Sequence, residues 1–213
     1  MATGRPVLLV LAGVNGAGKS SIGGNVMQRR AGMPWFNPDP YTRLLVQGGM
    51  SPSEANALAW QHGVDLLDAA IANCHSHAFE TTLGGTTITK RIVAAARSHD
   101  ILTWFCGLSS PDQHIARVAA RVVAGGHDIP RAKIIERWVN APLNLIALMP
   151  YLTELRVYDN SADAAAGDLV PDPVLLLHLR SGKVAYPVAL KDLEHTPEWA
   201  KPIVKAARDL ECA

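Results

Sequence analysis

The apolar positions of this chain follow two different patterns. Residues 7–12 are apolar without interruption, as in a parallel strand that is buried on both faces. Residues 51–74 instead carry apolar side chains three or four positions apart, which predicts a long helix. Ser51 and Glu54 form a capping box at the start of that helix, with Pro52 in its first turn. Helices and strands are therefore both expected.

The same criteria predict elements along the whole chain. Strands are expected at residues 7–12, 35–40, 77–80, 101–108 and 155–158, and a β-hairpin at 174–179 and 184–188. Helices are expected at residues 19–30, 51–74, 87–97, 110–123, 130–152 (bent near Pro142) and 198–210, and a loop at 161–173. Pro38 and Pro40 are expected to end the second strand and to stop regular structure there.

Strands that alternate with helices predict the fold class. We expect an α/β fold in which a parallel sheet is flanked by helices on both faces, followed by a C-terminal β-hairpin and helix. Ligands then bind beyond the carboxyl ends of the strands. A length of 213 residues predicts a single domain over residues 1–213, with the hairpin and closing helix at 174–213.

The amino-acid composition indicates which partners and which cellular compartment to expect. The net charge of +1 argues against a nucleic-acid partner. No apolar run approaches the length of a membrane span, so no membrane partner is expected. The three cysteines are odd in number, far apart and not in metal-binding spacing, which is typical of a reducing, cytoplasmic compartment.

The stretch GVNGAGKSS at residues 13–21 matches the pattern G-x-x-x-x-G-K-[ST] of a phosphate-binding loop. Its glycines allow a ring of inward-pointing N–H groups at a helix N-terminus, where an anion is favoured. Lys19 can reach the phosphates of ATP or GTP, and the Ser20 hydroxyl can ligate Mg²⁺. The residues expected to contact the nucleotide are Gly13, Asn15, Gly16, Ala17, Gly18, Lys19, Ser20 and Ser21. Because residues 7–12 lead directly into this loop, they are interpreted as a strand and not as part of a signal peptide.

Two further strand ends carry carboxylates. Asp39, in the segment Asn-Pro-Asp, could accept a proton from an attacking hydroxyl, or it could belong to an ordinary proline-rich turn. Glu80, in Phe-Glu-Thr-Thr, could bind sugar hydroxyls or water on Mg²⁺, or it could cap the next helix at the surface. Residues 158–161 could read a nucleotide base or form an Asx-turn.

Residues of about 110–140 form a candidate lid. Arg117 and Arg121 lie four positions apart on one predicted helix face, and the glycine pair at 125–126 provides a hinge before Arg131 and Arg137. Such arginines could neutralise charge on a transferred phosphoryl group, or they could form a solvated basic face. Beside a phosphate-binding loop, the lid is the favoured interpretation.

Six segments together resemble the zeta-toxin family of P-loop kinases. In chain order they are GVNGAGKSS, FNPD, FETT, RVAARVVAGGHDIP, NLIALMPYL and VYDNS, and the resemblance covers roughly residues 7–161. It implies phosphorylation of the sugar of UDP-N-acetylglucosamine from ATP or GTP with Mg²⁺, which starves bacterial cell-wall precursor synthesis. It also implies a small helical antitoxin that blocks the nucleotide site, expected here as a separate protein.

The resemblance assigns roles to individual residues. Lys19 and Ser20 would hold phosphate and metal, and Asp39 would be the catalytic base. Glu80 and Thr81 would face the sugar substrate. Two lid arginines would stabilise the transferred phosphoryl group. The positions that match these arginines best are Arg121 and Arg137, with Arg117 and Arg131 as competitors.

Two other functions stay open. A metabolic or antibiotic-modifying kinase on the same fold could use Asp39 on another small-molecule hydroxyl. A nucleotide-dependent switch would need a base-reading motif such as Asn-Lys-x-Asp, and a mechanical ATPase would need an apolar strand that ends in Asp or Asp-Glu. The sequence contains neither feature at the corresponding positions, which favours a kinase.

Overall fold

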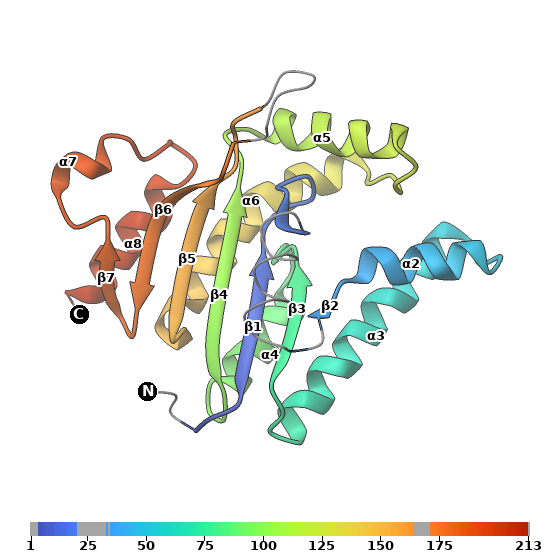
Figure 1. Cartoon of the computed structure of the whole chain (residues 1–213), viewed down its shortest axis with the longest axis horizontal. Helices are drawn as coiled ribbons and strands as arrows, with labels where there is room; N and C mark the ends of the chain where they lie inside the picture. Colours follow the sequence, from blue (N-terminus) through green and yellow to red (C-terminus); the bar gives the residue numbers. More distant parts are fainter. Residues whose placement is uncertain (1–3, 21–32, 34, 164–170, 213) are drawn as a thin grey trace.

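The computed structural model describes residues 4–20, 33, 35–163 and 171–212, and these residues contain one seven-stranded sheet (Figure 1). The strand order is β2-β3-β1-β4-β5-β6-β7. The strands are β1 (Val7–Ala12), β2 (Trp35–Phe36), β3 (His77–Thr81), β4 (Asp100–Gly107), β5 (Glu154–Asp159), β6 (Val174–Arg180) and β7 (Lys183–Tyr186). The pairings among β1 to β5 are parallel, whereas β6 and β7 extend the sheet as an antiparallel hairpin. The predicted α/β class and the hairpin are confirmed.

Helices fill the connections between strands. They are α2 (Pro38–Gln47), α3 (Pro52–Ala72), α4 (Thr86–Ala95), α5 (Pro111–Val123), α6 (Arg131–Leu148), α7 (Leu190–Leu193) and α8 (Lys201–Glu211), with a 3₁₀ turn at Met149–Tyr151. The helix predicted at residues 19–30 begins at Lys19 and Ser20, and the rest of it lies outside the described residues. No helix within the described ranges is long and apolar enough to cross a membrane.

The prediction for Pro38 and Pro40 was wrong, because a helix begins where regular structure was expected to stop. Asn37 is the N-cap of α2, and its side-chain oxygen accepts the Asp39 N–H at 2.9 Å. Pro38 occupies the first helical position, where a missing N–H leaves no hydrogen bond unmade. Asp39 therefore lies in the first turn of a helix and not at the end of a strand.

Two smaller differences also have local causes. The helix predicted to reach residue 152 ends at Leu148, since Met149–Tyr151 continues as a 3₁₀ turn. The single turn α7 was not predicted, because four residues are too few to show a helical period.

The continuous apolar character of β1 is explained by its central place in the sheet. Leu8 and Val10 pack into the larger core with α4, α6 and α8, which lie on the same side of the sheet (Figure 1). Leu9 and Leu11 point to the opposite face and pack with Cys106 of β4. Both faces of β1 are buried, so the phosphate-binding loop that follows begins from a rigid strand.

Candidate active site

The backbone of the phosphate-binding loop requires glycine at two positions. Gly16 and Gly18 have φ values of +83° and +79°, a conformation that side chains rarely adopt. A Cβ atom at Gly16 would lie 2.7 Å from the backbone oxygen of His114, and one at Gly18 would lie 2.3 Å from the side-chain nitrogen of Asn160. The two glycines therefore permit both the turn and the close approach of neighbouring elements.

Hydrogen bonds fix the loop to the sheet and to itself. The Gly13 N–H donates to the Thr81 carbonyl of β3 at 3.2 Å, and the Ala17 N–H donates to the Val14 carbonyl at 3.1 Å. The Lys19 ammonium donates to the same Val14 oxygen at 3.3 Å. The loop thus has a defined shape before any phosphate is considered.

Two side chains from other elements hold carbonyls of the loop. Nδ1 of His114, in α5, lies 2.8 Å from the Asn15 oxygen, and the Asn160 side chain donates to the Ala17 oxygen at 2.9 Å. Burial, and to a smaller extent the charges of Lys19 and Arg117, lowers the pKa of His114 to about 4 although its bond to Asn15 opposes this shift. His114 is therefore a neutral imidazole near pH 7.

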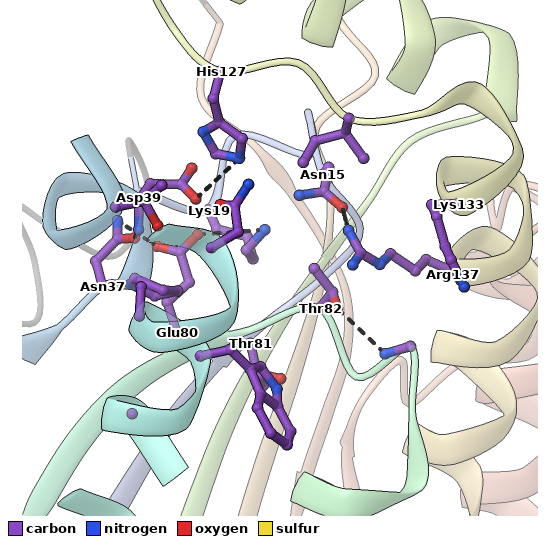
Figure 2. Close-up of a pocket in the computed structure, with 18 of the residues that line it drawn as sticks. Asn15, Lys19, Asn37, Asp39, Glu80, Thr81, Thr82, His127, Lys133 and Arg137 are labelled. Atoms are coloured by element: carbon purple, nitrogen blue, oxygen red, sulfur yellow. Dashed lines mark hydrogen bonds and ion pairs between the residues drawn. The ribbon is translucent and has the colours of Figure 1, made fainter. Parts of the chain in front are cut away.

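Lys19 and Glu80 form a buried ion pair at the base of the cavity, with Nζ 3.3 Å from Oε1 (Figure 2). The other Glu80 oxygen accepts from the Ser20 hydroxyl at 3.0 Å and from the Asn37 amide at 3.2 Å. Glu80 is consequently part of a polar cluster inside the cavity and does not cap the next helix, whose N-cap is Gly85. Of the two alternatives for Glu80, the surface cap is excluded.

The oxygen donors beside Lys19 fit Mg²⁺. Ser20 and Glu80 present a hydroxyl and a carboxylate, the hard oxygen ligands that Mg²⁺ prefers. Among the described residues, no group of three or more His, Cys, Asp or Glu side chains could hold a metal by itself. This donor set suits an ion that keeps several waters and shares phosphate oxygens with the protein.

Asp39 faces the cavity from the first turn of α2. Its Oδ2 accepts from Nη1 of Arg121 at 3.0 Å, and Nε2 of His127 lies 3.9 Å from its Oδ1. Arg121 also donates to the His127 carbonyl at 3.2 Å, which ties the helix α5 to the segment that follows it. Burial lowers the pKa of His127, so its ring favours the neutral form.

The four candidate arginines lie in different surroundings. Arg137, in α6, donates to the Asn15 side chain at 2.6 Å and is directed at the phosphate-binding loop (Figure 2). Arg117 also lines the cavity. Arg131 instead forms an exposed ion pair with Asp112 at 3.0 Å and does not line the cavity. Three of the four arginines therefore converge on one site.

These groups share a cavity of about 930 Å³, large enough for two small-molecule ligands. One end is the phosphate-binding loop. The other end is formed by α3, the β3–α4 connection and the first turns of α6. The residues that line the cavity include Phe36, Asn56, Trp60, Thr81, Ile88 and Lys133. Of the expected site residues, only Ser21 lies outside the described residues.

Sequence reasoning missed Asn37, His114 and His127 as members of the site. Asn37 and His127 stand in the FNPD and GGHDIP segments, so their nearness to candidate residues was an available signal. His114 is a single histidine on a helix with no motif around it. Only its contact with a loop 99 positions away along the chain reveals a role.

No protein-family model matches this sequence, and neither does any curated protein. Among solved structures, the AvrRxo1-ORF1:AvrRxo1-ORF2 complexes determined with sulphate ions and with ATP match with TM-scores of 0.63 and 0.62, at 17% and 18% identity. Each match covers 95% of this chain and 64% of the other, so this chain spans less than two thirds of that relative's length.

Two other structures extend the comparison. The PezAT chromosomal toxin-antitoxin system of Streptococcus pneumoniae matches with a TM-score of 0.57 at 14% identity, over 99% of this chain and 87% of the other. A putative kinase from Chloroflexus aurantiacus matches with a TM-score of 0.51 at 18% identity, over 62% of this chain and 78% of the other. This chain therefore shares its α/β fold with these structures.

Proposed function

We propose that this chain is a small-molecule kinase of zeta-toxin type, which transfers the γ-phosphate of ATP or GTP to a sugar hydroxyl of UDP-N-acetylglucosamine. The observation that supports this best is the convergence of Asp39 with Lys19, Arg121 and Arg137 in one cavity. Phosphoryl transfer requires a group that orients the acceptor hydroxyl and cations that neutralise the moving phosphoryl group. This cavity supplies both.

The phosphate end of the cavity binds the nucleotide in this proposal. Gly16, Gly18, Lys19 and Ser20 of the loop line the cavity and would donate backbone N–H groups to the phosphates, and Lys19 places its charge beside them. Ser20 and Glu80 hold Mg²⁺, which when bound neutralises negative charge on the phosphate oxygens.

Asp39 accepts the proton of the acceptor hydroxyl as that oxygen bonds to the γ-phosphorus. Arg121 donates to Asp39 through Nη1 and to the His127 carbonyl through Nη2, so its guanidinium charge lies beside the proposed base and would neutralise charge on the phosphoryl group. Arg137 stabilises the same charge from the side of α6. Arg117 is a third cation of the site. Arg131 has no role in the proposal, because it does not line the cavity and forms an exposed ion pair with Asp112.

The acceptor occupies the end formed by α3, the β3–α4 connection and α6. Thr81 faces the sugar in this proposal, whereas Glu80, also expected there, is assigned to the metal site because its oxygens contact Lys19, Ser20 and Asn37. Trp60 lines the cavity although it is 48% exposed, and its flat indole offers a surface on which a uracil or sugar ring can stack. Lys133 supplies a positive charge for a diphosphate.

An antitoxin partner is part of the proposal. The structures of AvrRxo1-ORF1:AvrRxo1-ORF2 and of PezAT each contain a partner protein or belong to a toxin-antitoxin system. If this chain starves cell-wall synthesis, its expression in bacteria should cause arrest or lysis that Lys19→Ala relieves. A co-expressed antitoxin should relieve it as well.

The decisive experiment is a product analysis by mass spectrometry. The protein is incubated with Mg²⁺ and either ATP or GTP, together with UDP-N-acetylglucosamine, other nucleotide sugars, aminoglycosides or simple alcohols. UDP-N-acetylglucosamine should gain one phosphoryl group, and Lys19→Ala should abolish the gain. Phosphorylation of another alcohol in place of the nucleotide sugar would favour the metabolic or antibiotic-modifying kinase. No phosphorylation of any acceptor would contradict the kinase proposal.

A further inference from the structure

Two residues outside the phosphate-binding loop form hydrogen bonds with its carbonyl oxygens. The ring of His114 is 1% exposed, and its Nδ1 lies 2.8 Å from the Asn15 oxygen. A carbonyl only accepts hydrogen bonds, so Nδ1 must carry the proton. Asn160, just after β5, donates to the Ala17 oxygen at 2.9 Å.

Each of these bonds fixes one peptide plane. The Asn15 carbonyl and the Gly16 N–H belong to the same planar trans peptide, so they point in opposite directions. The Ala17 carbonyl and the Gly18 N–H are related in the same way. Because His114 and Asn160 hold the two carbonyl oxygens of these peptides on the outer side of the loop, the two N–H groups are turned toward its interior.

The two N–H groups are available to a ligand. Gly16 and Gly18 both line the cavity, and within the described part of the chain neither N–H donates to another protein atom. A backbone N–H with no protein partner at the edge of a cavity needs water or a bound acceptor. A phosphate oxygen is such an acceptor.

We propose that His114 and Asn160 are positioning residues, which orient the Gly16 and Gly18 N–H groups toward the phosphates of the bound nucleotide. This inference rests on the proposed function, because it takes the ligand to be a nucleotide. It adds two residues that do not themselves line the cavity.

Glycine's conformational freedom explains why such residues are needed. The φ values of +83° and +79° are accessible to glycine alongside many others, so the loop glycines do not select one peptide orientation by themselves. A peptide turned the other way would direct a carbonyl oxygen at the phosphate. Hydrogen bonds from a buried histidine and from a strand-end asparagine remove that alternative and preorganise the site.

The test measures the dissociation constants of inorganic pyrophosphate and ADP by titration calorimetry. His114→Leu removes the donor and should weaken both ligands about 10- to 100-fold, the range for one charge-assisted hydrogen bond. His114→Asn should recover most of this loss, because its amide nitrogen, like Nδ1, is bonded to Cγ. His114→Gln places the nitrogen one bond further out and should recover little.

A buried histidine elsewhere is the matched control. His99 is also 1% exposed, and its ring contacts the His75 carbonyl at 3.1 Å far from the loop. His99→Leu should lower the melting temperature without changing pyrophosphate affinity. If His114→Leu does not fold, Asn160→Ala replaces it in the test, because Asn160 is only partly buried. Asn160→Ala should weaken pyrophosphate binding by a similar factor.

The outcomes separate this inference from the proposed function. Equal pyrophosphate affinity in the wild type and in folded His114→Leu and Asn160→Ala overturns the inference while the kinase proposal stands. Equal recovery by the Asn and Gln variants also overturns it, because donor position would then be irrelevant. Failure of the wild type to bind both pyrophosphate and ADP overturns the nucleotide site itself, and the inference with it.

Discussion

The two ends of the cavity are built in different ways. At the phosphate end, five lining residues between Asn15 and Ser20 come from one stretch of the chain, and its polar groups are held by partners such as Glu80 and Asn160. At the acceptor end, the lining comes from several separate elements, and Trp60 and Lys133 are each about half exposed. No compact motif unites that second group.

This difference fits what each end would bind under the proposed function. A triphosphate with Mg²⁺ presents the same charges and oxygens to every kinase, so the loop that binds it is constrained to glycines, one lysine and one hydroxyl. An acceptor can be any small alcohol, and its recognition depends on the shape and polarity of a particular pocket. Substitutions at the two ends should therefore have separable effects on nucleotide binding and on acceptor binding.

The largest effect is expected from Lys19→Ala. It removes the cation that contacts the phosphates, so turnover should fall by several orders of magnitude and nucleotide affinity should fall as well. Glu80 keeps its bonds to Ser20 and Asn37, so the fold should be retained, as circular dichroism can check. Lys133→Ala, in the same cavity but more exposed, is the control and should retain nucleotide affinity. Wild-type turnover in a folded Lys19→Ala protein would contradict the kinase proposal.

Asp39→Asn tests whether turnover can be lowered without a change in nucleotide affinity. The change keeps the shape of the side chain but removes the base, so turnover should fall roughly 10²- to 10⁴-fold. The nucleotide dissociation constant should barely change, because the carboxylate serves the acceptor. A loss of nucleotide binding with unchanged turnover per bound nucleotide would make Asp39 a metal-site or structural residue. Glu80 would then be the next candidate for the base.

The effect of replacing an arginine on turnover should depend on whether its side chain lines the cavity. Arg121→Ala and Arg137→Ala should each lower turnover about 10- to 100-fold, as expected when one charge-assisted hydrogen bond to the phosphoryl group is lost. Replacement by lysine should recover little, because a point charge replaces a planar fork. Arg131→Ala is the matched control, and its turnover should equal the wild type since Arg131 does not line the cavity. A comparable loss in all three alanine variants would indicate a general effect of the basic surface.

The smallest effect is expected from Trp60→Ala at the acceptor end. Loss of one stacking surface should raise the KM for the acceptor about 3- to 10-fold and leave nucleotide affinity unchanged. Trp60→Phe should recover part of the loss because it keeps an aromatic face. Steady-state kinetics with the acceptor varied at saturating nucleotide make the measurement. An unchanged KM would mean that the acceptor does not contact α3.

Most of the secondary structure and the phosphate-binding loop could be predicted from the sequence. The strands β1, β3, β4 and β5, the hairpin and most helices were predicted. The spacing of apolar residues differs between helices and strands, and it indicates which side of each element is buried. The phosphate-binding loop was also predicted, since its positive φ values depend on glycines within the motif itself. The helices α2 and α7 were exceptions, and α2 was missed because an Asn cap before Pro38 and a proline turn use the same residues.

The tertiary structure alone decided which residues meet. Arg121 and Arg131 have the same chemistry in the sequence, and only the fold directs the first to Asp39 and the second to the surface. His114 and Asn160 lie roughly a hundred or more positions from the loop carbonyls that they hold, so no local pattern could reveal either contact. Local sequence determines backbone conformation and burial because those depend on neighbouring residues. Partner choice between distant side chains depends on the packing of whole elements, which exists only once the sheet and its helices have assembled.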